Sequence, residues 1–170
     1  MIVGIEAPMS AGKTLVMTYF LISEYCDLRK RLLTNYNLLR LPSERFDVST
    51  VEAYLERKIS LKGRAVGLDE AHLMLDSRLS MTRRNRIVSY FLTQTSKNDI
   101  NLYYTTQDLG MVDVRLRRQT AIGVTVEQLN DTHFRVTGAN RFTGKKVIDG
   151  VLDGSAVFPH FDTHEVIDVG

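Results

Sequence analysis

The chain has 170 residues, of which 44% are hydrophobic and 25% charged, so it is long and apolar enough to bury the core of one compact domain. With 22 basic and 20 acidic residues the net charge is +2, which excludes an overall electrostatic attraction to nucleic acid or membrane. A single cysteine excludes an internal disulfide, and the absence of any apolar run of about 18 residues leads us to expect a soluble, intracellular protein.

Strands and helices alternate along the first part of the chain. An apolar run predicts a strand over residues 1–7, and helical spacing of apolar residues predicts a helix over 12–26. A second strand is expected over 31–38, followed by a short helix over 46–58 that Asp47 or Ser49 would cap.

The alternation continues with a buried strand in "RAVGLDEAH", a helix over 80–98 and a strand in "INLYYTTQ". Strands that alternate with helices favour a parallel sheet covered on both faces.

The last forty residues have a different pattern. Residues 133–154 alternate apolar and polar side chains between Gly and Asn turns, which predicts antiparallel hairpins. No linker separates them from the preceding chain, so they are expected to extend the same sheet or pack on its edge. We therefore predict one domain, with a core of alternating strands and helices over 1–129 and a β-rich extension over 130–170.

The loop "APMSAGKT" matches a slightly relaxed P-loop pattern, with Ala where Gly is commoner. The pattern needs a preceding strand and a following helix, because backbone N–H groups and the positive helix end must converge on phosphate oxygens. Both flanks satisfy this condition. The predicted nucleotide-binding residues are Ala7, Pro8, Met9, Ser10, Ala11, Gly12, Lys13 and Thr14. Lys13 would reach the β- and γ-phosphates, and Thr14 would ligate Mg²⁺.

Two adjacent carboxylates follow the buried strand of "AVGLDEAH". Asp69 is expected at the carboxyl end of that strand, where ligands of open α/β sheets collect, and we assign it to the magnesium shell through a water. Glu70 is the candidate general base, because a second carboxylate is extra to metal binding and suits activation of water. His72 is expected to be a neighbouring or packing residue, since one domain cannot contain the second motor of a helicase with the letters "DEAH".

Gln107 ends the strand "INLYYTTQ" and is a further candidate catalytic residue. A carboxamide at that position can orient water or bond the γ-phosphate. A surface Gln that opens a loop is the alternative interpretation.

Basic residues cluster twice, around Arg84 and in "VDVRLRRQT". A cation from a neighbouring subunit can stabilise transition-state charge, and Arg84, Arg115 and Arg118 are candidates for that role; solvated helix faces are the alternative. In the tail, Arg141 and the pair Lys145–Lys146 could touch a phosphate backbone, without an aromatic platform for reading bases.

The chain resembles the FtsK/HerA superfamily of P-loop ATPases in four segments: "APMSAGKT", "VGLDEAHLMLDSR", "VSYFLTQTSKNDINLYYTTQ" and "VDVRLRRQT". The likeness covers nearly the whole chain. Within this superfamily the chain is most similar to genome-packaging ATPases of tailless, internal-membrane viruses of archaea and bacteria, and it is also similar to zonula occludens toxin-like phage assembly proteins. The ending "HFDTHEVI" looks like an Asp-Thr-x-Glu tail of packaging proteins.

The resemblance implies an α/β P-loop NTPase fold of the RecA/ASCE-like type, a three-layer sandwich with a mostly parallel central sheet and an antiparallel C-terminal hairpin extension. It also implies that the "INLYYTT" strand lies between the P-loop strand and the "AVGLDE" strand, which would bring Gln107 beside Lys13 and Glu70.

For function, the resemblance implies ATP and Mg²⁺ as cofactors, a hexameric ring, and double-stranded DNA bound without sequence specificity. A motor that packages a viral genome into a preformed capsid is the first hypothesis, in the host cytoplasm or at a capsid vertex, with a capsid-vertex or membrane protein as a further partner. Alternatives are a zonula occludens toxin-like phage morphogenesis ATPase, a small-molecule P-loop kinase and a nucleotide switch that does not hydrolyse.

Overall fold

The computed structural model describes residues 1–46, 60–74 and 99–162 without a break, together with residues 50, 53–54, 56–57, 89, 92–95 and 97. The strands are β1 (Ile2–Glu6), β2 (Arg31–Thr34), β3 (Ser43–Arg45), β4 (Arg64–Leu68), β5 (Asn101–Thr106), β6 (Ile122–Gln128), β7 (His133–Asn140) and β8 (Lys146–Asp153). The helices are α1 (Lys13–Cys26), α3 (Ala71–Met74) and α5 (Val114–Gln119), with 3₁₀ turns η2 (Leu109–Met111), η3 (Gly154–Ala156) and η4 (Phe158–His160).

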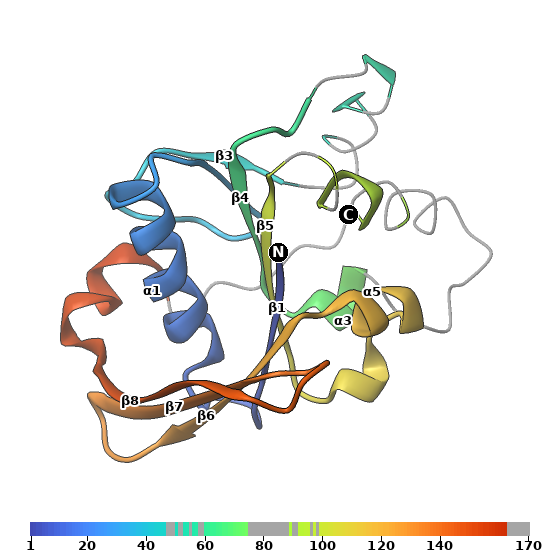
Figure 1. Ribbon diagram of the computed structural model, residues 1–170. Coiled ribbons are helices and arrows are strands. Elements are labelled where there is room, and N and C mark those ends of the chain that lie inside the picture. Colours follow the sequence, from blue (N-terminus) through green and yellow to red (C-terminus); the bar gives the residue numbers. More distant parts are fainter. Residues whose placement is uncertain are drawn as a thin grey trace.

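All eight strands form one sheet in the order β3-β2-β4-β5-β1-β6-β7-β8 (Figure 1). The first six strands in this order, β3, β2, β4, β5, β1 and β6, are parallel to one another. Strand β7 pairs antiparallel with β6, and β8 pairs antiparallel with β7. Strand β5 lies between β1 and β4, as the resemblance implied. The predicted α/β fold with a mostly parallel sheet and an antiparallel extension is therefore confirmed.

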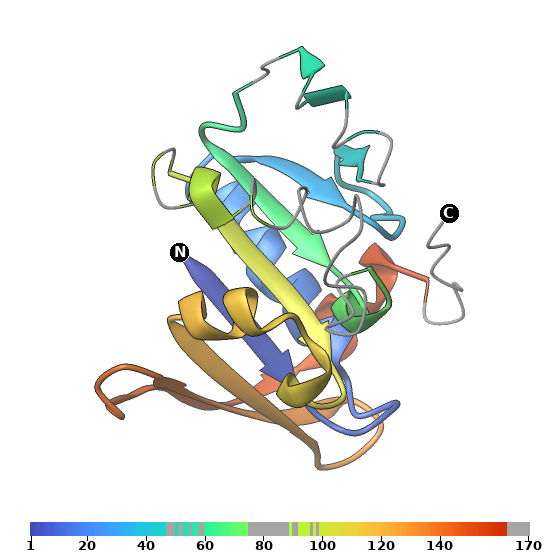
Figure 2. The same cartoon turned by 90° about the vertical axis from the view of Figure 1, so that its right-hand side faces the viewer.

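Helices cover both faces of the parallel strands. Helix α1 lies on one face, and α3 and α5 lie on the other (Figures 1 and 2). The alternation of strand side chains explains this arrangement: Tyr103 packs in the core beneath α1, and Tyr104 packs in the core on the opposite face. Both rings are buried, so the central strand β5 is apolar on each side.

Some predicted boundaries were wrong. The strand predicted over 31–38 ends at Thr34, and the side chain of the next residue, Asn35, bonds the main chain of Asp69 at the end of β4. The strand in "RAVGLDEAH" ends at Leu68, directly before the two carboxylates as predicted, and Glu70 has a left-handed backbone with φ of 48°. Strand β3 was missed, since its three residues are exposed and polar and carry no apolar pattern.

Two predicted helices fall largely outside the described residues. Asp47 and Ser49, the candidate caps of the helix over 46–58, are among the residues not described. Of the helix over 80–98, residues 92–95 are described and are helical. In the part of the chain that the structure describes, no helix is both long enough and apolar enough to span a membrane.

Candidate active site

The loop between β1 and α1 has the shape of a phosphate cradle. Gly12 is the N-cap of α1 with φ of 87°, and no side chain caps the helix at this end. Ser10 has φ of 60°, so the loop turns through two left-handed residues before the helix begins. The first N–H groups of a helix have no partner within the helix and carry partial positive charge, which makes this end suited to an anion.

The glycine at position 12 is required by space as well as by φ. A Cβ atom added there would lie 2.5 Å from two ring carbons of Phe134, a residue of β7 that is 3% exposed. The loop therefore rests directly on an aromatic ring that the C-terminal extension contributes. Sequence reasoning missed this contact, because Phe134 and Gly12 are 122 positions apart and the ring's partner is a residue without a side chain.

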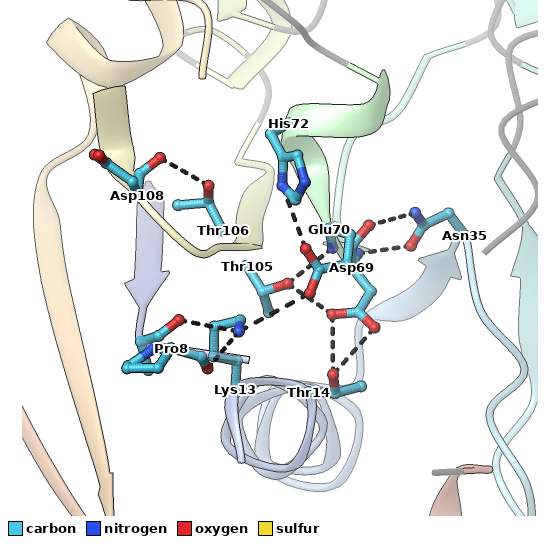
Figure 3. A network of polar contacts seen from close by, with 11 residues as sticks. Pro8, Lys13, Thr14, Asn35, Asp69, Glu70, His72, Thr105, Thr106 and Asp108 are labelled. Carbon is cyan, nitrogen blue, oxygen red and sulfur yellow. Dashed lines mark hydrogen bonds and ion pairs between the residues drawn. The ribbon is translucent and has the colours of Figure 1, made fainter. Parts of the chain in front are cut away.

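Lys13 is buried with its ammonium held inside the loop. Its Nζ donates to the carbonyl oxygens of Ala7 at 3.0 Å and Pro8 at 2.9 Å, and lies 3.9 Å from Oε1 of Glu70 (Figure 3). Buried ammonium groups are stable only with such partners. The contacts fix the lysine between the loop and Glu70, and its predicted reach to the β- and γ-phosphates stays a prediction.

Thr14 and Asp69, the two residues that the sequence assigned to Mg²⁺, are in direct contact, and their role as ligands stays a prediction. The Thr14 hydroxyl lies 3.0 Å from both carboxylate oxygens of Asp69, and the Thr105 hydroxyl donates to Oδ1 of Asp69 at 2.6 Å. Burial raises the pKa of Asp69 above its ordinary value, while the hydrogen bonds from Thr105 and Thr14 act in the opposite direction. A hydroxyl and a carboxylate are hard oxygen donors, so this pair fits Mg²⁺.

Glu70 lies between two basic residues. Its Oε1 faces Lys13, and its Oε2 is 3.3 Å from Nδ1 of His72, the residue expected only to be a neighbour (Figure 3). Among the described residues, neither Oε2 nor Nδ1 has a hydrogen-bond partner. The backbone of Glu70 is left-handed. For a residue other than Gly this conformation costs about 1–3 kcal/mol, and it persists where surrounding contacts impose it.

Two polar residues that sequence reasoning missed hold the carboxylate pair in place. Thr105 of β5 bonds Asp69 and also accepts the backbone N–H of Glu70 at 2.8 Å. Asn35, directly after β2, accepts the N–H of Asp69 at 2.7 Å and donates to its carbonyl oxygen at 2.8 Å. A signal was present for Thr105, a polar residue near the end of the strand predicted to lie beside "AVGLDE"; for Asn35 there was none, because it lay inside the strand predicted over 31–38 and no neighbour was predicted for that strand.

The remaining predicted residues have mixed outcomes. Gln107 follows β5 and is partly buried, but no polar contact among the described residues joins it to Lys13 or Glu70. Its catalytic role stays a prediction.

The arginines that could act on a neighbouring subunit have separate outcomes. Arg115 donates to Asp113 at 2.8 Å and to Ser89 at 2.6 Å, and Arg118 is exposed. Arg84 lies outside the described residues. For all three arginines, a contact with the nucleotide bound to a neighbouring subunit remains a prediction.

A second polar cluster ties α1 to β5 at the end away from the phosphate loop. Glu24, 4% exposed, accepts hydrogen bonds from Tyr103 at 2.5 Å and Asn101 at 2.6 Å, and lies 3.4 Å from the Lys30 ammonium. Burial raises the pKa of Tyr103. These contacts fix the C-terminal end of α1 against the strand that also carries Thr105.

Comparison with solved structures gives clear similarities, whereas no protein-family model and no curated protein sequence matches the chain. The N-terminal domain of zonular occludens toxin from Neisseria meningitidis matches with a TM-score of 0.70 and 15% identity, over 95% of this chain and 98% of that one. The genome packaging NTPase B204 from Sulfolobus turreted icosahedral virus 2, in complex with ATP-gammaS, matches with a TM-score of 0.63 and 12% identity, over 88% of this chain and 96% of that one.

A KaiC-like protein from the hyperthermophilic archaeon Pyrococcus horikoshii matches with a TM-score of 0.52 and 11% identity, over 89% of this chain and 82% of that one. The chain has the fold of P-loop NTPases. At identities of 10% to 15% the likeness concerns the fold.

Proposed function

We propose that this protein is an ATP-hydrolysing motor that moves double-stranded DNA, and that it packages a viral genome into a preformed capsid. The observation that carries the proposal is the convergence of Lys13 and Thr14, which follow β1, with Asp69 and Glu70, which follow β4, at the carboxyl ends of parallel strands on either side of β5. ATP is the proposed substrate, because the solved packaging NTPase with the same fold is described in complex with ATP-gammaS.

Each residue has a definite task in the proposed hydrolysis. The N–H groups at the start of α1 bind the phosphates, and Lys13 moves its ammonium from the loop carbonyls to the β- and γ-phosphate oxygens. Thr14 and Asp69 would hold Mg²⁺, Asp69 through a water, and the ion would neutralise charge on the phosphates. Thr105 keeps Asp69 oriented for this purpose.

Glu70 is the proposed general base. Its side chain is 24% exposed, so it combines contact with Lys13 and access to water. Its carboxylate would orient the attacking water and accept a proton from it. A kinase, which transfers the phosphoryl group to a second substrate, does not need a water-activating carboxylate at this position. This argues against a small-molecule kinase. Gln107 is proposed as a second water-orienting or phosphate-sensing group at the end of β5.

DNA translocation by a hexameric ring is the finer part of the proposal. Its support is the likeness to packaging NTPase B204, together with the sequence resemblance to packaging ATPases. In such a ring Arg84, Arg115 or Arg118 would supply a cation to the neighbouring subunit's ATP. The protein would act in the host cytoplasm or at a capsid vertex, with a capsid-vertex or membrane protein as partner.

A second candidate function is phage morphogenesis as a zonula occludens toxin-like ATPase. The observation that favours it is the TM-score of 0.70 with the toxin's N-terminal domain, over nearly all of both chains. The two candidates share ATP hydrolysis and differ in their use of DNA.

The experiment that tests the proposal is ATP hydrolysis by the purified chain, with and without a DNA duplex, alongside particle mass from analytical ultracentrifugation. Lys13→Ala controls for a contaminating ATPase. Hydrolysis that duplex DNA stimulates, from a ring-sized particle, supports the packaging motor. Hydrolysis that DNA leaves unchanged favours the morphogenesis ATPase, and no hydrolysis at all rules out both.

A further inference from the structure

The turn between β7 and β8 carries a group of cations that the nucleotide site does not use. We call this group the basic tip: Arg141, Lys145 and Lys146 of the turn, Arg117 of α5, and the aromatic Phe142. Residues 141–147 are all exposed, and the ring of Phe142 is 67% exposed. The sequence analysis found no aromatic platform for reading bases among these cations, and the structure shows one exposed ring, Phe142, directly after Arg141.

The turn is preformed. The Asn140 side chain accepts the N–H groups of Phe142 and Thr143, each at 3.0 Å, and its carbonyl accepts the N–H of Gly144 at 2.8 Å. These bonds satisfy the turn within itself, so its basic side chains do not need to order on binding.

Arg141 is anchored beside α5. Its guanidinium donates to the carbonyl oxygen of Arg117 at 2.8 Å, and its backbone N–H donates to Ala121 at 2.8 Å. Its aliphatic stem crosses Gly123, where a Cβ would lie 3.3 Å from Cδ. Arg141 therefore holds the turn beside α5, the helix that carries Arg117. Of the four cations of the basic tip, Lys146 alone has a carboxylate partner among the described residues, Asp149 at 2.5 Å.

The basic tip lies near the amino-terminal ends of the parallel strands, whereas the phosphate loop lies at their carboxyl ends. Asn140 pairs with Ile122 at the start of β6, Ile122 pairs with Val3 near the start of β1, and the phosphate loop follows the end of β1. In Figure 2 the orange turn projects beyond the sheet at the lower left. A ligand on this surface would not compete with nucleotide.

We propose that the basic tip contacts the phosphate backbone of double-stranded DNA, an inference that rests on the proposed function and names the contacting segment. Exposed cations with few acidic partners neutralise phosphates without reading sequence. Phe142 adds an apolar contact with sugars or a groove. Phe142 and Val147 are the large apolar side chains exposed over residues 141–147, and they offer less apolar surface than the apolar helix face that inserts into a membrane.

The test is binding of a fluorescent 30-bp DNA duplex to the full chain with bound ATP analogue, by anisotropy over a range of salt concentrations. Lys145→Gln with Lys146→Gln should weaken binding about tenfold, and should reduce the slope of log K against log salt by about 1.8, because two phosphate contacts are lost. Phe142→Ala should weaken binding and leave the slope unchanged.

The matched control is Arg29→Gln with Lys62→Gln, which removes the same charge from exposed sites elsewhere. It should keep the slope of the unmodified chain, and thermal unfolding checks that every variant is folded. Equal slopes in the lysine double variant and the unmodified chain would overturn the basic tip and leave the proposed motor intact. No duplex binding by the unmodified chain, or tighter binding to phosphatidylserine vesicles, would overturn the inference together with the DNA part of the proposed function, and ATP hydrolysis would then stand by itself.

Discussion

Gly12 of the phosphate loop lies directly against Phe134 of the C-terminal extension, so close that any Cβ at position 12 would overlap the ring. The contact joins the first motif in the chain to an antiparallel strand more than a hundred residues later. It gives the extension a part in shaping the phosphate loop, besides its part in the sheet.

Phe134→Leu should therefore impair nucleotide binding as well as stability. The smaller side chain leaves space beneath Gly12, and we expect the affinity for a fluorescent ATP analogue to fall about fivefold, roughly 1 kcal/mol. Phe46→Leu is the matched control, since Phe46 is equally buried but packs in the core on the other face of the sheet. Equal affinities in the two variants at similar unfolding free energies would contradict a specific role for Phe134.

Glu70→Gln should abolish turnover while nucleotide still binds. The amide keeps the size of the side chain but cannot accept a proton from water, so we expect kcat to fall about 100-fold or more and the nucleotide affinity to stay within about threefold. A steady-state assay with a parallel binding titration measures both. Unchanged turnover in this variant would show that Glu70 is not the base.

Thr105→Val should slow ATP hydrolysis more than the same substitution at the neighbouring Thr106. The change removes the hydrogen bond to Asp69 and the acceptor for the Glu70 N–H, and should cost about 1–2 kcal/mol of stability and about tenfold in kcat. Thr106→Val is the matched control, because that hydroxyl is also buried but donates to the carbonyl of Asp108 (Figure 3). If both variants lose rate equally, Thr105 has no special influence on the carboxylates.

Asp113→Asn should make the free energy of unfolding less dependent on pH in the acidic range. Hydrogen bonds from the Arg115 side chain and backbone hold the pKa of Asp113 below its ordinary value. Since the folded-state pKa lies below the unfolded one, Asp113 stabilises the fold above the ordinary pKa, and this contribution is lost as pH falls through that value toward the folded-state pKa.

The loss of unfolding free energy in Asp113→Asn should therefore be about 1 kcal/mol at pH 7 and should shrink near pH 3, as measured by urea denaturation at both values. Asp149→Asn, an exposed aspartate paired with Lys146, should change little at either pH. A constant difference across this range would mean that the ion pair with Arg115 is unimportant.

Local sequence patterns were sufficient to predict the strands, loop and helix that carry the candidate active site. The apolar run of β1, the loop with Gly12 and the periodic helix α1 follow from residues near one another in sequence, as do the buried β4 strand and its terminal carboxylates. These features are dictated by short-range backbone preferences and by alternation, which act within a few residues. The hairpin of β7 and β8 was also predictable, since its turn residues and alternation are local.

The tertiary structure alone decided which side chains meet. Asn35 and Thr105 reach Asp69 because β2, β4 and β5 are neighbours in the sheet, and the order of parallel strands depends on packing across the whole chain. For the same reason Phe134 supports the phosphate loop. The amino-acid sequence by itself determined the parts of the site and their local geometry, because those depend on neighbouring residues; long-range packing determined the contacts that orient them.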